Sequence, residues 1–412
     1  MRILVDQSGR HLKNMGDLAM LRSSVMRLSW QWPEAEIMVI TEPTADLAAH
    51  VPDAISVRPT SDYQLIRHLP RRYRSRWQAL PYLSGRVSLG RMPPSRPCTS
   101  LQAVRAADVV VAAGGGYLTD VFRWHAAGVL GLLSLAQRLG KPTAMFGQGI
   151  GPISERTLRA QARAVLPKLA VLSLREGGMS RDLALSLGAR PDAVTVTGDD
   201  ALELVGSDGI PDGDALGINV RLARYAGVDL AAAAVVGDVV VREAVARRAP
   251  IVALPVASGE FEDDLRAIRS VLPAGAPDVK VDIRDLNTPR ALADSAASCR
   301  VIVTGSYHAA VFGLAQGVPA VCITRSAYYD NKFAGLQSFF PGACSVISLD
   351  SINFSDRLRT AIDQAWRLPA PLRVAARDAA IRQRDAGREA YATFRSAAEK
   401  MLQPSLPIAM PE

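Results

Sequence analysis

The sequence has few of the residues that build a disulfide-rich, metal-binding or membrane-spanning protein. Its four cysteines lie far apart, with no CxxC pair and no Cys/His cluster, so neither a disulfide framework nor a structural zinc site is indicated. No apolar run approaches the roughly 20 residues of a membrane-spanning helix. The N-terminus lacks the apolar region and cleavage site of a secretory signal, and we therefore expect a cytoplasmic protein.

Acidic residues are also fewer than basic ones. The 412 residues contain 48 basic and 40 acidic side chains, for a net charge of +8. Eight arginines and no acid lie between Arg67 and Arg96, with aromatic residues among them. This stretch indicates a proline-rich loop that contacts an anionic substrate or a phospholipid surface. No zinc-finger, RRM or KH signature accompanies it, so we expect no nucleic-acid partner and leave peripheral membrane contact through Arg67–Arg96 open.

Short apolar runs that alternate with amphipathic segments are abundant. Near-continuous β-branched runs separated by helices are typical of a parallel sheet covered on both faces. In the first half, strands are predicted at residues 3–6, 36–41, 108–113, 142–147, 170–174 and 195–198. Helices are predicted between them at residues 17–30, 121–139, 155–166 and 179–187. The pattern predicts a doubly wound α/β fold.

A break in this alternation divides the chain. Residues 206–214, GSDGIPDGD, have the composition of a turn or linker. Beyond it, strands are predicted at residues 216–220, 251–255, 279–282, 300–304 and 320–323, and helices at residues 230–248, 260–272, 289–298 and 308–316. Residues 355–401 are mostly helical, with interruptions at Pro369 and Pro371. We predict domains at 1–205 and 215–350, joined by the linker 206–214 and followed by C-terminal helices and a tail at 351–412.

The loops that follow the predicted strands carry the polar and glycine-rich motifs. In open parallel sheets, ligands bind outside the carboxyl ends of the strands. The glycine runs 114–116 and 147–151 fit a cradle for an anion or a sugar, although each could be only a tight turn. Neither is a GxGxxG fingerprint, and GxxxxGK[ST] is absent, so NAD and P-loop chemistry are not indicated.

Several charged side chains are expected at the same edge. His308 begins a predicted helix, where an imidazole can donate to an anion or transfer a proton. Arg175 and Arg221 end predicted strands and offer planar forks for carboxylate or phosphate. Each could instead form a structural salt bridge, as Arg175 could with Asp199 or Asp200. Three further residues could contact a ligand, but each also has a purely structural interpretation. Ser306 and Asp17 could be helix caps, and Lys332 could be a surface charge.

Seven motifs recur here in an order that resembles one known family. They are Asn14-x-Gly16-Asp17, Gly114-Gly115-Gly116-x-Leu118, Gly147-Gln148-Gly149-Ile150-Gly151-Pro152, Ser173-Leu174-Arg175-Glu176 with Ser180, Gly198-Asp199-Asp200-Ala201, Ser306-x-His308 and Gly317-Val318-Pro319. Together they resemble the polysaccharide pyruvyl transferases over roughly residues 1–340. The resemblance implies two Rossmann-like domains in a GT-B-like arrangement, with C-terminal helices that cross back.

The resemblance also implies an activity and roles for residues. The family transfers the enolpyruvyl carbon of phosphoenolpyruvate (PEP) to a sugar, giving a pyruvate ketal, with PEP as co-substrate and no other cofactor or metal. His308 matches the catalytic histidine. The residues implied to bind the donor are Arg175, Arg221, Lys332, Ser306 and Tyr307. The residues implied on the acceptor side are Asn14, Gly16, Asp17, Gly115 and Gly116, and Gln148 is implied to bind substrate as well.

One departure from the family pattern leaves alternatives open. Many members carry Arg-Leu-His where this chain has Ser306-Tyr307-His308, so one donor-anchoring charge is missing and Arg325 is a candidate substitute. A GT-B glycosyltransferase that uses a nucleotide sugar would occupy the same cleft, with Asp330 and Tyr328 near the ribose and base. A third reading is a binding or scaffold protein without catalysis.

Overall fold

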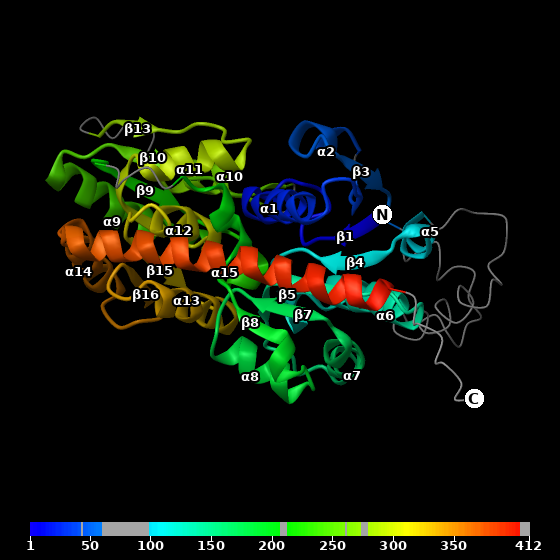
Figure 1. Ribbon diagram of the computed structural model, residues 1–412. Helices are drawn as coiled ribbons and strands as arrows, with labels where there is room; N and C mark the ends of the chain where they lie inside the picture. The colour runs from blue at the N-terminus through cyan, green and yellow to red at the C-terminus, as the bar shows by residue number, and fades with distance from the viewer. Residues whose placement is uncertain (43, 60–98, 207–211, 260–261, 273–278, 404–412) are drawn as a thin grey trace, which may run out of the picture.

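The first half of the chain folds around a parallel sheet of eight strands. The computed structural model describes residues 1–42, 44–59, 99–206, 212–259, 262–272 and 279–403 (Figure 1). The strands are β1 (Arg2–Asp6), β2 (Glu36–Ile40), β3 (Ala54–Val57), β4 (Val109–Ala112), β5 (Gly115–Leu118), β6 (Thr143–Ile150), β7 (Val171–Leu174) and β8 (Val194–Val196). They lie in the order β3-β2-β1-β4-β6-β7-β8, and β5 pairs with β6.

Helices cover both faces of this sheet. They are α1 (Met15–Gln31), α2 (Thr44–His50), α5 (Thr99–Ala106), α6 (Arg123–Arg138), α7 (Arg156–Val165) and α8 (Met179–Ser186). In β1, Ile3 and Val5 pack into one hydrophobic core and Leu4 into another. Successive side chains of a strand point to opposite faces, so continuous apolar runs such as β1 require a helix layer on each side.

The second half repeats the plan with a parallel sheet of six strands. The strands are β9 (Ala215–Asn219), β10 (Ile251–Ala253), β13 (Val281–Asp282), β14 (Cys299–Thr304), β15 (Ala320–Thr324) and β16 (Cys344–Ser348), in the order β13-β10-β9-β14-β15-β16. A small antiparallel pair is formed by β11 (Ser258–Gly259) and β12 (Glu262–Asp263). The helices are α9 (Leu230–Arg247), α10 (Asp264–Val271), α11 (Pro289–Ala297), α12 (Tyr307–Leu314) and α13 (Ala327–Phe339).

Both sheets reverse their strand order at one point, between β1 and β4 in the first and between β9 and β14 in the second. In doubly wound folds this reversal opens a crevice at the carboxyl ends of the two strands, where ligands bind. The fold therefore offers two such crevices, and the residues that follow these four strands are the expected ligand contacts.

The last two helices connect the halves. Helix α14 (Phe354–Trp366) packs on the second sheet through Phe354, Leu358 and Ile362. Helix α15 (Ala370–Leu402) then runs from the second sheet back across the first (Figure 1). On it, Tyr391 stacks on Phe146 of β6 with ring centroids 3.7 Å apart. The predicted arrangement of two Rossmann-like units with helices that cross back is confirmed.

Some local predictions were wrong for identifiable reasons. Pro371 does not interrupt a helix, because it lies in the first turn of α15, where the missing N–H has no partner to lose. Gly115 and Gly116 belong to the strand β5 rather than to a loop. The sequence analysis also did not predict β3, β16, α2, α5 and α13, because these elements are short or lack strong periodicity.

Several expectations concern residues outside the described part of the chain. These are the basic stretch between Arg67 and Arg96, Cys98, residues 207–211 of the linker, and the tail after Gln403. Among the described residues, no helix combines the length and the apolar character needed to span a bilayer.

Candidate active site

A cavity of about 250 Å³ lies between the two halves, where the two strand-order reversals face each other. From the first half it is lined by Ser8, Asn14, Asp17, Gly116, Tyr117, Phe122, His125 and Arg175. From the second half it is lined by Arg221, Tyr225, Glu262, Ser306, Tyr307, His308, Tyr328, Tyr329 and Lys332. Residues far apart in the sequence therefore meet at the position that the topology favours.

His308 is held in a fixed orientation by both halves. It lies in the first turn of α12, directly after β14. A Cβ on Gly16 would lie 1.9 Å from His308 Nδ1, so only glycine allows α1 to begin against this ring. His308 Nε2 lies 3.5 Å from Asp199 Oδ2. Nε2 therefore faces Asp199, and Nδ1 is the ring atom nearest to the start of α1.

Asp199 is a buried carboxylate that serves several groups. Its Oδ1 accepts a hydrogen bond of 2.8 Å from the backbone N–H of Ala201, and its Oδ2 lies 3.7 Å from Arg175 Nη1. Burial alone would raise the pKa of Asp199, but His308, Arg175 and the Ala201 N–H together lower it. The carboxylate of Asp199 therefore stays ionised beside the His308 ring.

Arg175 is buried and keeps part of its guanidinium unsatisfied. Its Nε donates to Glu176 Oε2 at 3.1 Å, and its Cζ lies 4.5 Å from the centre of the Tyr307 ring. Within the described residues, Nη1 and Nη2 donate no hydrogen bond. Burial alone would lower its pKa, but Glu176 and other neighbours raise it, so the group remains a cation. The sequence left two roles open for Arg175, a ligand contact or a salt bridge. The structure has Arg175 both paired with Asp199 and in the cavity lining.

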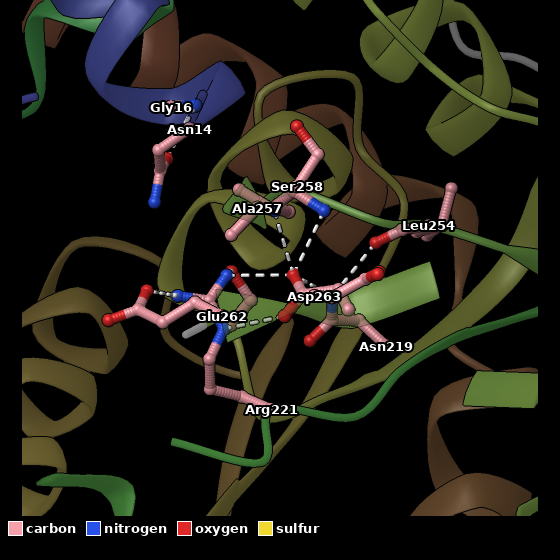
Figure 2. A network of polar contacts seen from close by, with 12 residues as sticks. Asn14, Gly16, Asn219, Arg221, Leu254, Ala257, Ser258, Glu262 and Asp263 are labelled. Carbon is pink, nitrogen blue, oxygen red and sulfur yellow. Dashed lines mark hydrogen bonds and ion pairs between the residues drawn. The ribbon is translucent and has the colours of Figure 1, made fainter. Parts of the chain in front are cut away.

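The guanidinium of Arg221, by contrast, is occupied by two acids and two hydroxyl groups, and Figure 2 shows it with Glu262. Its Nε and Nη2 donate to the two oxygens of Asp264 at 2.8 and 2.7 Å, and its Nη1 lies 3.4 Å from Glu262 Oε2. Nη2 also lies 3.4 Å from Ser306 Oγ. Ser306 precedes α12 without capping it through its side chain, so its predicted role as a side-chain cap was wrong.

Asp264 also holds the contact between the two halves. Its Oδ2 accepts from the backbone N–H groups of Val256 and Ala257 at 2.9 and 3.0 Å. This segment pairs with the start of α1 through an antiparallel bridge between Asn14 and Ala257, which Figure 2 shows side by side. Asn14 Oδ1 caps α1 by accepting from the N–H groups of Gly16 and Asp17, at 3.0 and 3.2 Å. The interpretation of Asp17 as the cap was therefore wrong.

Lys332 projects from α13 into a cage of aromatic rings. Its Nζ lies 5.1, 4.9 and 5.3 Å from the ring centres of Tyr307, Tyr328 and Tyr329. Within the described part of the chain, no carboxylate forms an ion pair with it. Burial and the neighbouring Arg175 lower the pKa of Lys332 to about 7. Asp17 and Glu176 act on Lys332 only from beyond ion-pair distance, so this cation can still receive an anionic ligand.

Comparison with known proteins assigns the chain to a family. A family model described as polysaccharide pyruvyl transferase matches residues 14–327. The chain belongs to this family, and it is a transferase. The comparison with curated proteins gave no match.

Solved structures show the same fold as this pyruvyl transferase family member. The UDP-GlcNAc 2-epimerase from Neisseria meningitidis, solved with UDP-GlcNAc, is 12% identical, with 95% of this chain and 99% of that chain covered and a TM-score of 0.61. MurG from Acinetobacter baumannii is 13% identical, with 97% and 99% covered and a TM-score of 0.53. The calicheamicin glycosyltransferase CalG4 is 15% identical, with 97% and 98% covered and a TM-score of 0.51. These likenesses show the GT-B fold.

Three residues that the family resemblance places in the site do not line the cavity. Gly16 lies beneath His308, and a Cβ on Gly115 would lie 2.4 Å from the Tyr117 ring. Gln148 is buried and donates to the Ala113 carbonyl at 2.7 Å and the Tyr117 hydroxyl at 3.0 Å. These residues support the residues that line the cavity. The two glycines leave room for neighbouring rings, and the Gln148 side chain is used in buried hydrogen bonds.

Two further expectations were wrong. Arg325 does not replace the missing arginine of this family member, because it pairs with Asp229 and Asp350 at 3.0 Å each and lies outside the cavity lining. Asp330 accepts a hydrogen bond of 2.8 Å from Thr324 and does not line the cavity either, whereas Tyr328 does.

The sequence reading omitted several residues of the lining. They are Ser8, Tyr117, Phe122, His125, Tyr225, Glu262 and Tyr329, together with Tyr328 in its role around Lys332. The cluster Tyr328-Tyr329-x-x-Lys332 was a usable signal, because residues three and four apart share a helix face. The others come from loops and strand ends, where no periodicity marks them.

Proposed function

We propose that this chain transfers the enolpyruvyl carbon of PEP to a pair of sugar hydroxyls and so forms a pyruvate ketal. The observation that carries the proposal is Lys332, a caged cation without a carboxylate partner among the described residues, in the same cavity as His308. Arg175 adds two nitrogens without hydrogen bonds. PEP carries a phosphate and a carboxylate, and such a donor supplies the missing negative charge.

The mechanism follows from the placement of these groups. We place the phosphate and carboxylate of PEP against Lys332, Arg175 and the start of α12. His308, protonated and supported by Asp199, gives a proton to the methylene carbon. The C2 centre becomes cation-like, a sugar hydroxyl attacks it, phosphate leaves, and a second hydroxyl closes the ketal. Arg221 acts mainly by holding Ser306 and the contact between the halves, because acids occupy its guanidinium.

The acceptor in this proposal is a sugar of a glycan or glycolipid. A second cavity, of about 270 Å³, adjoins the first along Gly116, Arg175, Tyr328 and Lys332 and offers room for the rest of the acceptor. We place the reaction in the cytoplasm, with the stretch between Arg67 and Arg96 as a contact to a membrane that holds a lipid-linked acceptor. Loss of liposome binding on neutralising those arginines, without any turnover, would favour the scaffold reading instead.

A thermal-shift panel of PEP against nucleotide sugars tests the donor. PEP at 100 times its Kd is expected to stabilise the protein by about 2.7 kcal/mol, whereas UDP-sugars are expected to give no shift. The shared fold with a UDP-GlcNAc-bound epimerase makes nucleotide sugars the relevant comparison. A shift with UDP-sugars and none with PEP would favour the glycosyltransferase alternative.

The affinity for PEP is expected to fall as the pH rises through about 7. Lys332 has a pKa lowered to about 7, so it is charged below this pH and neutral above it, and an anionic donor prefers the charged form. Titration calorimetry from pH 6 to 9 measures this. The variant K332R provides the control, because arginine stays charged over this range and should flatten the dependence. An affinity of the natural protein that does not change with pH contradicts the role given to Lys332.

A further inference from the structure

The proposed reaction needs a proton acceptor as well as the acid His308. Two hydroxyl groups each lose a proton when a ketal forms from PEP. One proton ends on the methylene carbon and the other leaves with phosphate. A group beside the cavity must therefore accept the proton of the first attacking hydroxyl.

Only one described carboxylate in the cavity lining is free to do this. The two acids of the lining are Asp17 and Glu262, and Glu262 lies 3.4 Å from Arg221 Nη1. Among the described residues, Asp17 forms no ion pair, and its carboxylate accepts no hydrogen bond. Since Asn14 caps α1, the helix end does not use the Asp17 carboxylate. Two other bases line the cavity: His125 has its Nε2 enclosed by protein, and Lys332 is assigned to the charge of the donor.

The start of α1 places Asp17 next to the acid. Gly16 packs against the His308 ring, and the Cα atoms of neighbouring residues lie about 3.8 Å apart. The hydrogen bond of 2.8 Å from Met15 N–H to the Val256 carbonyl fixes this turn to the second half. A substrate that touches His308 therefore lies within reach of the next residue of α1.

From these contacts we infer that Asp17 is the general base that deprotonates the first acceptor hydroxyl. The inference rests on the proposed pyruvyl transfer. As the hydroxyl oxygen bonds to C2, Asp17 takes its proton, and the imidazolium of His308 gives a proton to the methylene carbon. The C2–O bond to phosphate then breaks with its electron pair on the phosphate, which takes the proton from Asp17. The second hydroxyl bonds to C2 and passes its proton to His308, so both residues are restored.

The variant D17N tests this role. The assay follows phosphate released from PEP in the presence of a panel of methyl hexopyranosides. We expect kcat to fall roughly 10²–10⁴-fold. The Kd of PEP should change little at pH 6, where Lys332 is charged in both proteins, although Asp17 raises the pKa of Lys332. The acidic limb of the pH–rate profile should disappear, and added formate should restore part of the rate of D17A. D53N, which removes an exposed carboxylate elsewhere, serves as the matched control and should behave as the natural protein.

The outcomes distinguish a failure of the general-base role of Asp17 from a failure of the proposed pyruvyl transfer. A natural protein that releases no phosphate from PEP contradicts the proposed function itself. An active natural protein whose D17N variant keeps its kcat, or changes only the KM of the acceptor, contradicts the role of Asp17 alone. If D17N unfolds, the variant D17E provides a second test. Retained activity with a shifted pH–rate profile supports Asp17 as the general base, and an unshifted profile contradicts this role.

Discussion

Replacement of His308 by alanine is expected to lower kcat for pyruvyl transfer by roughly 10²–10⁴-fold, the usual contribution of a general acid. The reason is geometric: Nε2 is held by Asp199 and the ring rests on Gly16, so no other described group can take the same position. Phosphate release from PEP measures the loss. Binding of PEP should weaken much less, because Lys332 and Arg175 remain.

The fold is expected to survive this change. His308 donates no hydrogen bond that another element needs, and Asp199 keeps Arg175 and the Ala201 N–H as neighbours. Thermal unfolding should therefore change little. The variant D199N should give a smaller loss of kcat, since it keeps the imidazole and removes only the carboxylate beside His308 and Arg175. A His308 variant with full turnover would exclude this residue as the acid.

Replacement of Arg27 by methionine is expected to destabilise the protein by about 3–5 kcal/mol, because it leaves the buried carboxylate of Asp200 without a cation, whereas Glu203 keeps Arg388. Arg27 lies in α1, with Nη1 2.6 Å from Asp200 Oδ1 and Nε 2.9 Å from Glu203 Oε2. Tyr391 of α15 donates to Asp200 at 3.1 Å. The cluster joins the crossing helix to the first half, so its loss should loosen α15.

Urea unfolding of R27M measures this effect, with R242M as the control. Arg242 forms an exposed pair with Asp238, at 2.8 Å, and exposed pairs of this kind contribute about 0.3–0.5 kcal/mol. Equal stability of the two variants would show that Arg27 is not the link between α1 and α15. Because Asp200 follows Asp199, R27M is also expected to reduce turnover.

The fold could be predicted from the sequence because its signals are local. The apolar runs of β1 and β4 and the helix between β14 and β15 are visible in the order of residues alone. The short strand β3 and the helix α13 were not predicted, since a few apolar residues without clear periodicity fit several structures. Gly115 and Gly116 suggested a loop, but their pairing with β6 depends on a strand elsewhere in the chain.

The site was predictable only in part. The sequence indicated which cations are present, but not which of them are paired with acids. The sequence indicated that Arg175, Arg221 and Lys332 would gather at one edge, and the structure places all three in one cavity. It gave no sign that Asp264 occupies Arg221, or that three tyrosine rings lie around the Lys332 ammonium group. Asp264 lies 43 positions from Arg221, and no periodicity relates them.

The order of residues alone determined two doubly wound units and the edge of the sheets at which the polar and glycine-rich motifs gather. These depend on backbone conformation and on burial patterns, which neighbouring residues set. The tertiary structure alone decided, among the described residues, that Lys332 and Asp17 form no ion pair and that Nε2 of His308 faces Asp199. These properties depend on distances of a few ångströms between distant segments, because electrostatic interactions and hydrogen bonds follow separation in space rather than along the chain.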